Sequence, residues 1–187
     1  MKKIKILTVL FIFFSFNCFL IGEENNFDLC DKFKDNFKSE IENNSLKIFE
    51  DDRGVVISLV SKIFFDLGAS NLKEEMISIL KKTSSLLNKI PNFVRVEGHT
   101  DNIPIKKENS KGGNFTNWEL SAARSLKVLR FLIDQGDVAP YRLSSEAFGQ
   151  YRPLGNNKTS EGRAFNRRVD IIILRKNEDS LSGRPLN

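Results

Sequence analysis

The residues best suited to chemistry lie in one short polar run, Glu97-Gly98-His99-Thr100-Asp101. Within it Glu97, His99 and Asp101 alternate, and His99 is the only histidine of the chain. Carboxylates and an imidazole are metal ligands, but one imidazole beside strand carboxylates falls short of the usual ligand sets. We therefore interpret His99 as a packing or hydrogen-bonding residue at a strand end, and we predict no metal ion and no cofactor.

Ser121 and Cys30 raise the question of catalysis because both side chains are potential nucleophiles. A hydrolase needs a base committed to its nucleophile, commonly with a Gly-x-Ser-x-Gly turn, and zinc peptidases carry a His-Glu-x-x-His pair. None of these patterns occurs in the sequence. We predict that the protein is not an enzyme.

A basic cluster of Arg163, Arg167 and Arg168 precedes the last apolar run. It has two interpretations: contact with an anionic wall polymer or lipid headgroups, or a solvated rim held by salt bridges. The formal net charge is +5, but Lys2, Lys3 and Lys5 lie in a leader without acidic residues, which leaves +2 for the rest. That charge is too small to predict nucleic-acid binding.

Period-two patterns place the polar run at the end of a strand. Residues 46–49 and 55–60 read as two strands around a turn at 50–54, where Gly54 is free to adopt a positive φ. The β-branched second strand is expected to be central. Further strands are expected at 93–97, 143–148 and 169–174, and the segment 102–115 reads as a long loop.

Two helices are expected between these strands. Ser70 can cap the first, whose apolar positions Leu72, Met76, Ile79, Leu80, Leu86 and Leu87 follow the 3.6-residue period. Thr116 and Glu119 have capping-box spacing for the second, with a predicted buried stripe of Ala122, Leu126, Leu129 and Ile133. After the opening strand the order is βαβαββ. We predict an α+β fold, a two-layer α/β sandwich with a mixed sheet and two helices on one face.

The first 22 residues read as an export leader, since three lysines precede an apolar run. Three fates stay open: cleavage after Gly22, which the composition favours, lipidation at Cys18, or retention as a membrane anchor. Residues 23–45 read as a polar spacer with one weak helix, and 179–187 as a flexible tail. Cys18 and Cys30 can pair only if the leader is retained.

Five motifs resemble the OmpA-like peptidoglycan-binding domain. They are Phe65-Asp66-x-Gly68, Glu97-Gly98-His99-Thr100-Asp101, Asn117-x-x-Leu120-Ser121-x-x-Arg124, Gly149-x-x-x-Pro153 and Asn166-Arg167-Arg168-Val169. The resemblance gives domain limits of 46–178. Asp101-Asn102-Ile103-Pro104 and Asn117-Trp118-Glu119-Leu120-Ser121 are similar to the branch that includes the flagellar stator protein MotB.

The resemblance implies that Asp101 and Arg124 bind the diamino acid of the cell-wall stem peptide. A diamino acid has an ammonium group and in some cases a carboxylate. One protein carboxylate can bind the ammonium, and one guanidinium can bind the carboxylate. Arg124 is expected to point off the buried stripe of its helix. Asn117 and Thr100 are candidate further contacts, and the resemblance adds Asn166 and Arg168 at the rim. The alternative for Asp101 and Arg124 is an internal salt bridge.

Non-catalytic peptidoglycan binding that anchors the cell envelope is therefore the predicted function, in the periplasm or on a membrane. A stator component or an envelope protein–protein scaffold is the alternative. Residues 4–22 contain no aspartate or glutamate, so the proton carrier of a stator helix is missing from them. The sequence leaves open which diamino acid is bound, whether a homodimer forms, and whether loop 102–115 gates the site or docks a partner.

Overall fold

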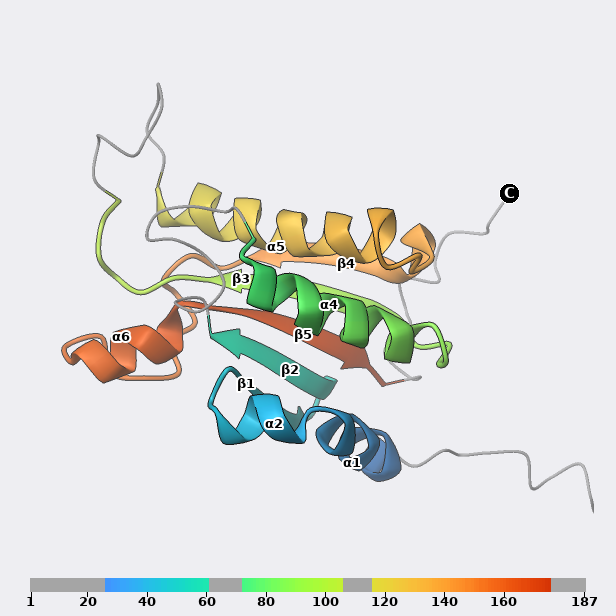
Figure 1. Ribbon diagram of the computed structural model, residues 1–187. Coiled ribbons are helices and arrows are strands. Elements are labelled where there is room, and N and C mark those ends of the chain that lie inside the picture. Colours follow the sequence, from blue (N-terminus) through green and yellow to red (C-terminus); the bar gives the residue numbers. More distant parts are fainter. Residues whose placement is uncertain (1–25, 61–71, 106–115, 176–187) are drawn as a thin grey trace, which may run out of the picture.

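The computed structural model describes residues 26–60, 72–105 and 116–175, and it contains one mixed five-stranded sheet of order β1-β2-β5-β3-β4 (Figure 1). The strands are β1 (Leu46–Asp51), β2 (Gly54–Val60), β3 (Val94–His99), β4 (Leu143–Ala147) and β5 (Arg168–Leu174). β3 and β4 pair in parallel, and the remaining pairs are antiparallel. The predicted α+β fold and mixed sheet are confirmed, and β2 is a central strand as expected.

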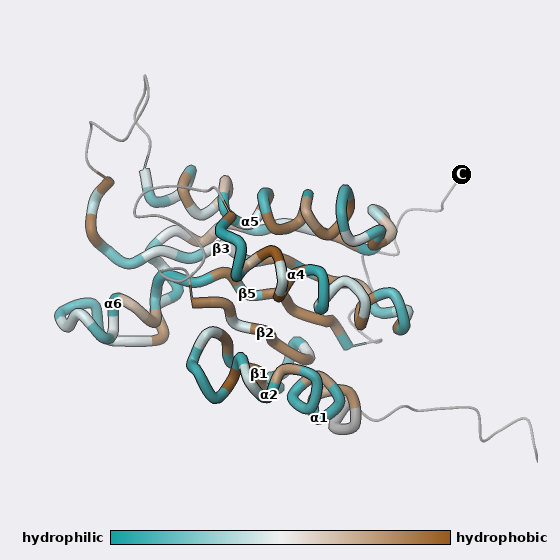
Figure 2. The backbone as a smooth tube through the Cα atoms, in the orientation of Figure 1, coloured by the Kyte–Doolittle hydropathy of each residue, from teal (hydrophilic) through white to brown (hydrophobic). Residues whose placement is uncertain are grey.

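Helices α4 (Glu74–Leu87) and α5 (Asn117–Asp134) cover one face of the sheet (Figure 1). Their apolar side chains form one core with alternate residues of the strands, among them Val55, Ile57, Val94, Val96 and Ile171. In Figure 2, hydrophobic residues (brown) run along β2, and hydrophilic residues (teal) lie on the outer turns of the helices. The short 3-10 turn η2 (Pro140–Arg142) and α6 (Ser160–Asn166) precede β4 and β5.

The β1–β2 turn confirms the expectation for Gly54. Its φ is +138°, and a Cβ at this position would lie 2.1 Å from the carbonyl oxygen of Ile173 in β5. Asp51 closes the turn, since its Oδ1 accepts a hydrogen bond from the backbone N–H of Arg53 at 2.9 Å. Glycine is therefore required twice, by its backbone angle and by the approach of β5.

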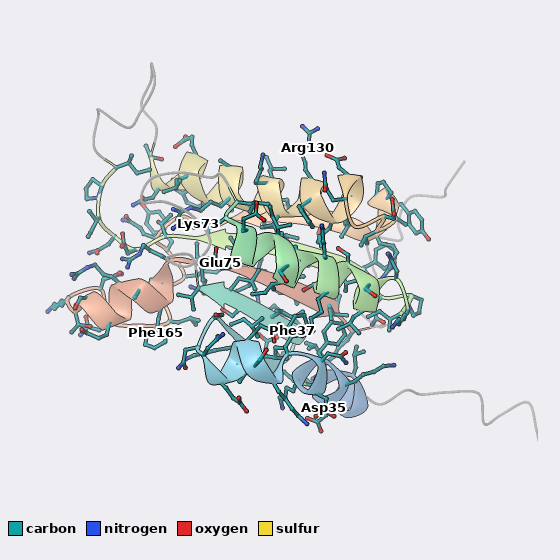
Figure 3. The ribbon with its side chains drawn as sticks, viewed as in Figure 1. Asp35, Phe37, Lys73, Glu75, Arg130 and Phe165 are labelled. Carbon is teal, nitrogen blue, oxygen red and sulfur yellow. The ribbon has the colours of Figure 1, made fainter. Side chains whose placement is uncertain are left out.

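The chain before β1 differs from the predicted spacer with one weak helix. Helices α1 (Asn26–Asn36) and α2 (Lys38–Glu42) lie beside β1 and extend the helical layer (Figure 1). Leu29, Phe33 and Phe37 are buried in the main core, and Phe37 lies next to α4, with Lys82 Nζ 4.7 Å from its ring centroid (Figure 3). Apolar residues recur every four positions in this otherwise polar segment, a pattern that indicated only a weakly amphipathic helix. Tertiary packing makes that stripe part of the core.

The buried stripe predicted for α5 is wrong. Leu126 is 49% exposed, and Ala122, Leu129 and Ile133 are only partly buried. The buried residues are Leu120, Ser121, Arg124, Ser125, Val128, Phe131 and Leu132. A Cβ on Gly98 of β3 would lie 2.0 Å from the carbonyl oxygen of Ser121, so α5 sits against β3 on its small polar residues. Counting apolar residues alone therefore selects the wrong side of the helix.

No helix within residues 26–60, 72–105 and 116–175 has the length and hydropathy needed to span a bilayer. The leader 1–22, the motif at 65–68, most of loop 102–115 and the tail 179–187 lie outside the described residues. Cys30 is a free, buried thiol.

Candidate functional site

Asp101 follows the end of β3 and is held by its own turn. Its Oδ1 accepts a hydrogen bond from the backbone N–H of Ile103 at 3.0 Å, and Thr100 Oγ1 donates to the Asp101 carbonyl at 2.9 Å. The residue is buried. The carboxylate therefore has a fixed direction rather than the freedom of an exposed aspartate.

Arg167 is the residue that forms an ion pair with Asp101. Its Nη1 donates to Asp101 Oδ2 at 2.5 Å. The two meet because β3 and β5 are antiparallel, with His99 opposite Arg168, so the end of β3 lies beside the start of β5. The sequence showed Arg167 only as one member of a basic cluster. Its partner depends on strand register, which no local motif specifies.

Arg124 lies on the buried side of α5, contrary to the expectation that it points off the buried stripe. Burial and, to a smaller extent, the nearby positive charge of Arg167 lower the pKa of Arg124 to about 10, although the negative charge of Asp101 acts in the opposite direction. The charges of Arg167 and Asp101 therefore both lie close enough to Arg124 to change its pKa. The contact between Gly98 and Ser121 explains its place, because that contact turns this face of α5 towards the end of β3.

Asn117 joins three segments around Asp101. Its Nδ2 lies 3.2 Å from the carbonyl oxygens of Asp101 and Ile103 and 3.0 Å from Gln150 Oε1, as donor in each case. The predicted capping box fixes the helix start that carries it. The Thr116 N–H donates to Glu119 Oε2 at 2.7 Å, and Thr116 Oγ1 accepts from the N–H of Trp118 at 3.2 Å.

The loop after β4 is tied to the same place. The N–H of Thr100 donates to the Gly149 carbonyl at 2.8 Å, and the N–H of Gly149 donates to Ser121 Oγ at 3.0 Å. Gly149 has φ +52°, which a glycine adopts without strain. On the outside of this loop the rings of Trp118 and Tyr151 are stacked, with centroids 5.3 Å apart.

Asn166 and Arg168, which were expected at the rim, are buried and hydrogen-bonded within the protein. Asn166 is buried, where its Oδ1 accepts from the N–H groups of Leu154 and Gly155, each at 2.8 Å. Arg168 Nε donates to Asp170 Oδ2 at 2.9 Å. Both side chains hold the protein's own loops and strands together. Motif spacing placed them near Asp101 but did not show where they point.

Two of the three residues considered for a metal site, Glu97 and His99, instead belong to a buried charge network. It lies on the sheet face opposite α4 and α5. His99 Nε2 lies 3.5 Å from both Glu97 Oε2 and Asp170 Oδ2, so Asp170 takes the place considered for Asp101. Arg53 Nη1 donates to Glu97 Oε2 at 2.7 Å, and Arg168 holds Asp170. Because guanidinium groups already neutralise these carboxylates, the cluster is a poor site for a divalent cation.

Burial lowers the pKa of His99, the Glu97 hydrogen bond opposes this, and the charge of Arg168 adds to the lowering. Burial raises the pKa of Glu97, but the hydrogen bonds and charges of His99 and Arg53 outweigh it and leave that pKa below its ordinary value. The ring of His99 also stacks on Phe148, with centroids 5.4 Å apart. His99 is thus a buried residue that packs on Phe148 and has its Nε2 near two carboxylates.

The two potential nucleophiles have structural surroundings. Ser121 Oγ donates to the Trp118 carbonyl at 2.9 Å and accepts from Gly149. Cys30 lies in the main core, and burial raises the pKa of its thiol. Neither side chain is placed for nucleophilic attack on a substrate.

The basic cluster is divided among internal contacts. Arg163 Nη1 donates to the Asn157 carbonyl at 2.9 Å, Arg167 pairs with Asp101, and Arg168 pairs with Asp170. By contrast, Arg130 of α5 projects away from the sheet (Figure 3). The salt-bridged rim therefore describes the cluster better than an open basic patch.

The fold and the site together define the class of protein. It is a five-stranded α+β sandwich with a carboxylate and two guanidinium groups at the β3–α5 junction. Within that class the chain belongs to the OmpA family, which residues 64–167 match. Motility protein B of Bacillus subtilis (strain 168) is 36% identical over 122 residues, which are 65% of this chain and 45% of that protein. The chain spans less than half the length of the first curated relatives it matches.

Solved structures give the same assignment. The cell wall anchor of the T6SS from Pseudomonas aeruginosa superposes with a TM-score of 0.67 at 26% identity, covering 76% of this chain and 96% of that one. A putative MotB like protein from Desulfovibrio vulgaris gives a TM-score of 0.72 at 25% identity, covering 82% and 93%. The predicted resemblance to the OmpA-like family and its MotB-like branch is confirmed.

Proposed function

We propose that this chain binds cell-wall peptidoglycan without chemical turnover, through the diamino acid of the stem peptide. The observation that carries the proposal is the meeting of Asp101, Arg124 and Arg167 at the end of β3, three buried or largely buried charged side chains. The similarity to a cell wall anchor and to MotB-like proteins supports it. In this proposal the protein anchors the cell envelope to the wall.

Asp101 receives the ligand's ammonium. A carboxylate accepts several hydrogen bonds, so an ammonium can join Arg167 on Asp101 without displacing it. Arg124 and Arg167 supply donors for a ligand carboxylate, where the ligand has one. Two charges 4 Å apart attract by about 1 kcal/mol in bulk water and about 4 kcal/mol at an effective dielectric of 20. The burial of this group therefore gives the contact its strength.

The other predicted site residues act through Asp101. Asn117 and Thr100 hold its backbone carbonyl, which makes them positioning residues in this proposal. Asn166 and Arg168 support the adjoining loop and strand. We assign direct ligand contact to Asp101, Arg124 and Arg167.

An exported, envelope-located protein fits this function, with a leader at 1–22 that is cleaved, lipidated or retained. The names of relatives such as the outer membrane protein Omp38 of Acinetobacter baumannii support an envelope location. Mass spectrometry of the mature N-terminus distinguishes the three fates of the leader by mass.

Co-sedimentation with insoluble cell-wall sacculi tests the proposal. The full chain, in a mild detergent, is compared with Asp101→Asn, which keeps the side-chain shape but removes the charge. Asp134→Asn is the matched control, because Asp134 is an exposed acid of α5 that pairs only with Arg130 among the described residues. We expect the wild type and Asp134→Asn to pellet and folded Asp101→Asn to stay in solution.

Thermal unfolding verifies that each variant is folded. A wild type that stays in the supernatant would refute peptidoglycan binding. Equal pelleting of folded Asp101→Asn and wild type would refute the assigned site.

A further inference from the structure

Two large aromatic side chains remain exposed beside the proposed site. Trp118 is 46% exposed and Tyr151 is 65% exposed, although their rings stack on each other with an interplanar angle of 28°. Each is fixed at its backbone, since the N–H of Trp118 donates to Thr116 Oγ1 and the N–H of Tyr151 donates to the Phe148 carbonyl at 3.1 Å. The pair is thus a preformed aromatic surface.

This aromatic pair is structurally continuous with Asp101. Asn117, the neighbour of Trp118, donates to the Asp101 carbonyl and to Gln150, the neighbour of Tyr151. The Asn117 amide lies 3.2 Å from the Asp101 carbonyl oxygen, and consecutive Cα atoms are about 3.8 Å apart, so the Trp118 Cα lies within roughly 11 Å of that oxygen. An extended ligand held at Asp101 can therefore reach the neighbouring aromatic pair.

The surroundings of the pair indicate what kind of group fits it. A sugar ring has an apolar face of C–H groups and a rim of hydroxyl and amide groups, so it suits an aromatic ring edged by polar side chains. Gln150 and Asn117 supply an amide edge, and exposed Glu119 and Arg152 lie next to the two aromatics in sequence. A lipid surface would require a wider apolar patch and tolerate fewer polar neighbours.

Resting on the proposed function, we infer that Trp118 and Tyr151 form a subsite for an N-acetylated amino sugar of the glycan strand that carries the bound peptide. Two amino acids separate the diamino acid from the sugar in a stem peptide, and two extended residues span about 7 Å. That span is of the same order as the upper limit on the distance from the Asp101 carbonyl oxygen to Trp118. The domain then binds two parts of one polymer. The charged diamino acid binds at Asp101, and the sugar binds at Trp118 and Tyr151.

The test uses the full chain in detergent and two soluble probes from one wall preparation, measured by isothermal titration. The first is the disaccharide–tripeptide released by a muramidase, and the second is the same tripeptide without sugars. We expect the wild type to bind the disaccharide–tripeptide about tenfold more tightly, in line with a well-placed aromatic contact. In the double variant Trp118→Ala/Tyr151→Ala that preference is lost, while affinity for the free tripeptide is unchanged.

Tyr141→Ala is the matched control. Tyr141 is 65% exposed, like Tyr151, but it precedes β4, whose start lies at the opposite end of the sheet because β3 and β4 are parallel. It should keep the full preference. Tyr151→Ala alone keeps Trp118 and the capping box, so a reduced preference in this variant supports the subsite even if the double variant fails to fold.

The outcomes separate the two claims. Equal binding of both probes by the wild type, or a retained preference in a folded double variant, overturns the sugar subsite and leaves the peptide site standing. If the wild type binds neither probe, the proposed function and the subsite are both overturned. Binding to phosphatidylglycerol vesicles that is lost in the double variant, without any sugar preference, would assign the pair to a lipid surface instead.

Discussion

At the residue scale, the ion pair between Asp101 and Arg167 is the least replaceable contact of the candidate site. The side chains are 8% and 20% exposed, so both have lost much of their hydration. Removing one partner leaves the other charge poorly solvated, which costs more than an exposed ion pair contributes. Asp101 is therefore both the proposed ligand contact and a structural anchor.

Arg167→Ala should lower the free energy of unfolding by about 1–3 kcal/mol, because it leaves the Asp101 carboxylate without this guanidinium. Arg130→Ala is the control, since Arg130 and its partner Asp134 are both largely exposed. That control should change stability by less than about 0.5 kcal/mol. Urea unfolding at pH 7 measures both, and equal effects would show that the buried pair has no special role.

His99 should make stability depend on pH in a defined window. Its folded-state pKa is lowered, chiefly by burial, so between the unfolded pKa near 6.5 and the folded pKa the unfolded chain binds more protons. Stability is then highest above about pH 6.5 and falls as pH falls through that window. The groups facing the imidazole are Glu97, Asp170, Arg168 and Phe148.

Replacing His99 with Gln should remove this loss of stability between pH 7.5 and 5.5, as measured by urea unfolding at each pH. Attribution is direct because the chain has no other histidine. Glu97, whose pKa lies below its ordinary value of 4.5, contributes only at lower pH. An identical fall in the variant over this window would show that other groups cause it.

At the scale of elements, the contact between β3 and α5 sets the site. Gly98 allows the backbone of Ser121 to approach, and Ser121 in turn holds the loop at Gly149. Three elements are thereby fixed around Asp101. A backbone contact of this kind cannot be relieved by a side-chain rotation, because the obstructing atom is a carbonyl oxygen of the helix.

Gly98→Ala should destabilise the protein by about 3 kcal/mol, since the added methyl must push α5 away from β3. Ala147→Gly is the matched change, because Ala147 of β4 lies in register with Gly98. Removing that methyl should cost only about 1 kcal/mol. Thermal and urea unfolding of both variants test the expectation, and a near-neutral Gly98→Ala would show that α5 can shift freely.

At the scale of the whole molecule, the helical layer extends beyond the family motifs. The chain before β1 contributes Phe33 and Phe37 to the same core as α4 and α5. The Nζ of Lys47 in β1 lies over the ring of Phe165, 4.2 Å from its centroid. Figure 3 shows Phe165 beside α6. Segments from both ends of the described chain therefore meet at the β1 side of the sheet.

Phe33→Ala should lower the free energy of unfolding by about 3–5 kcal/mol, the range for truncating a fully buried phenylalanine. Lys32→Ala on the exposed side of the same helix should change it by less than about 0.5 kcal/mol. Urea unfolding of the full chain in detergent compares the two. Similar small effects would mean that α1 is not part of the cooperative fold.

The sequence by itself determined the five strands and the two long helices α4 and α5, because hydrophobic period, turn residues and caps act over a few neighbouring residues. Gly54 in the first turn, the Thr116–Glu119 capping box and the strand that ends before Asp101 were predicted on this basis and are confirmed. The family motifs, in order along the chain, determined the class of fold. These signals are local or depend only on sequence order.

The tertiary structure alone decided which side chains meet. Arg167 rather than Arg124 pairs with Asp101, Asp170 rather than Asp101 joins Glu97 and His99, and Arg124 is buried. Strand register and the rotation of α5 about its axis set these pairings. Both follow from long-range packing of residues far apart in the chain, such as Gly98 against Ser121, and no local pattern encodes that packing.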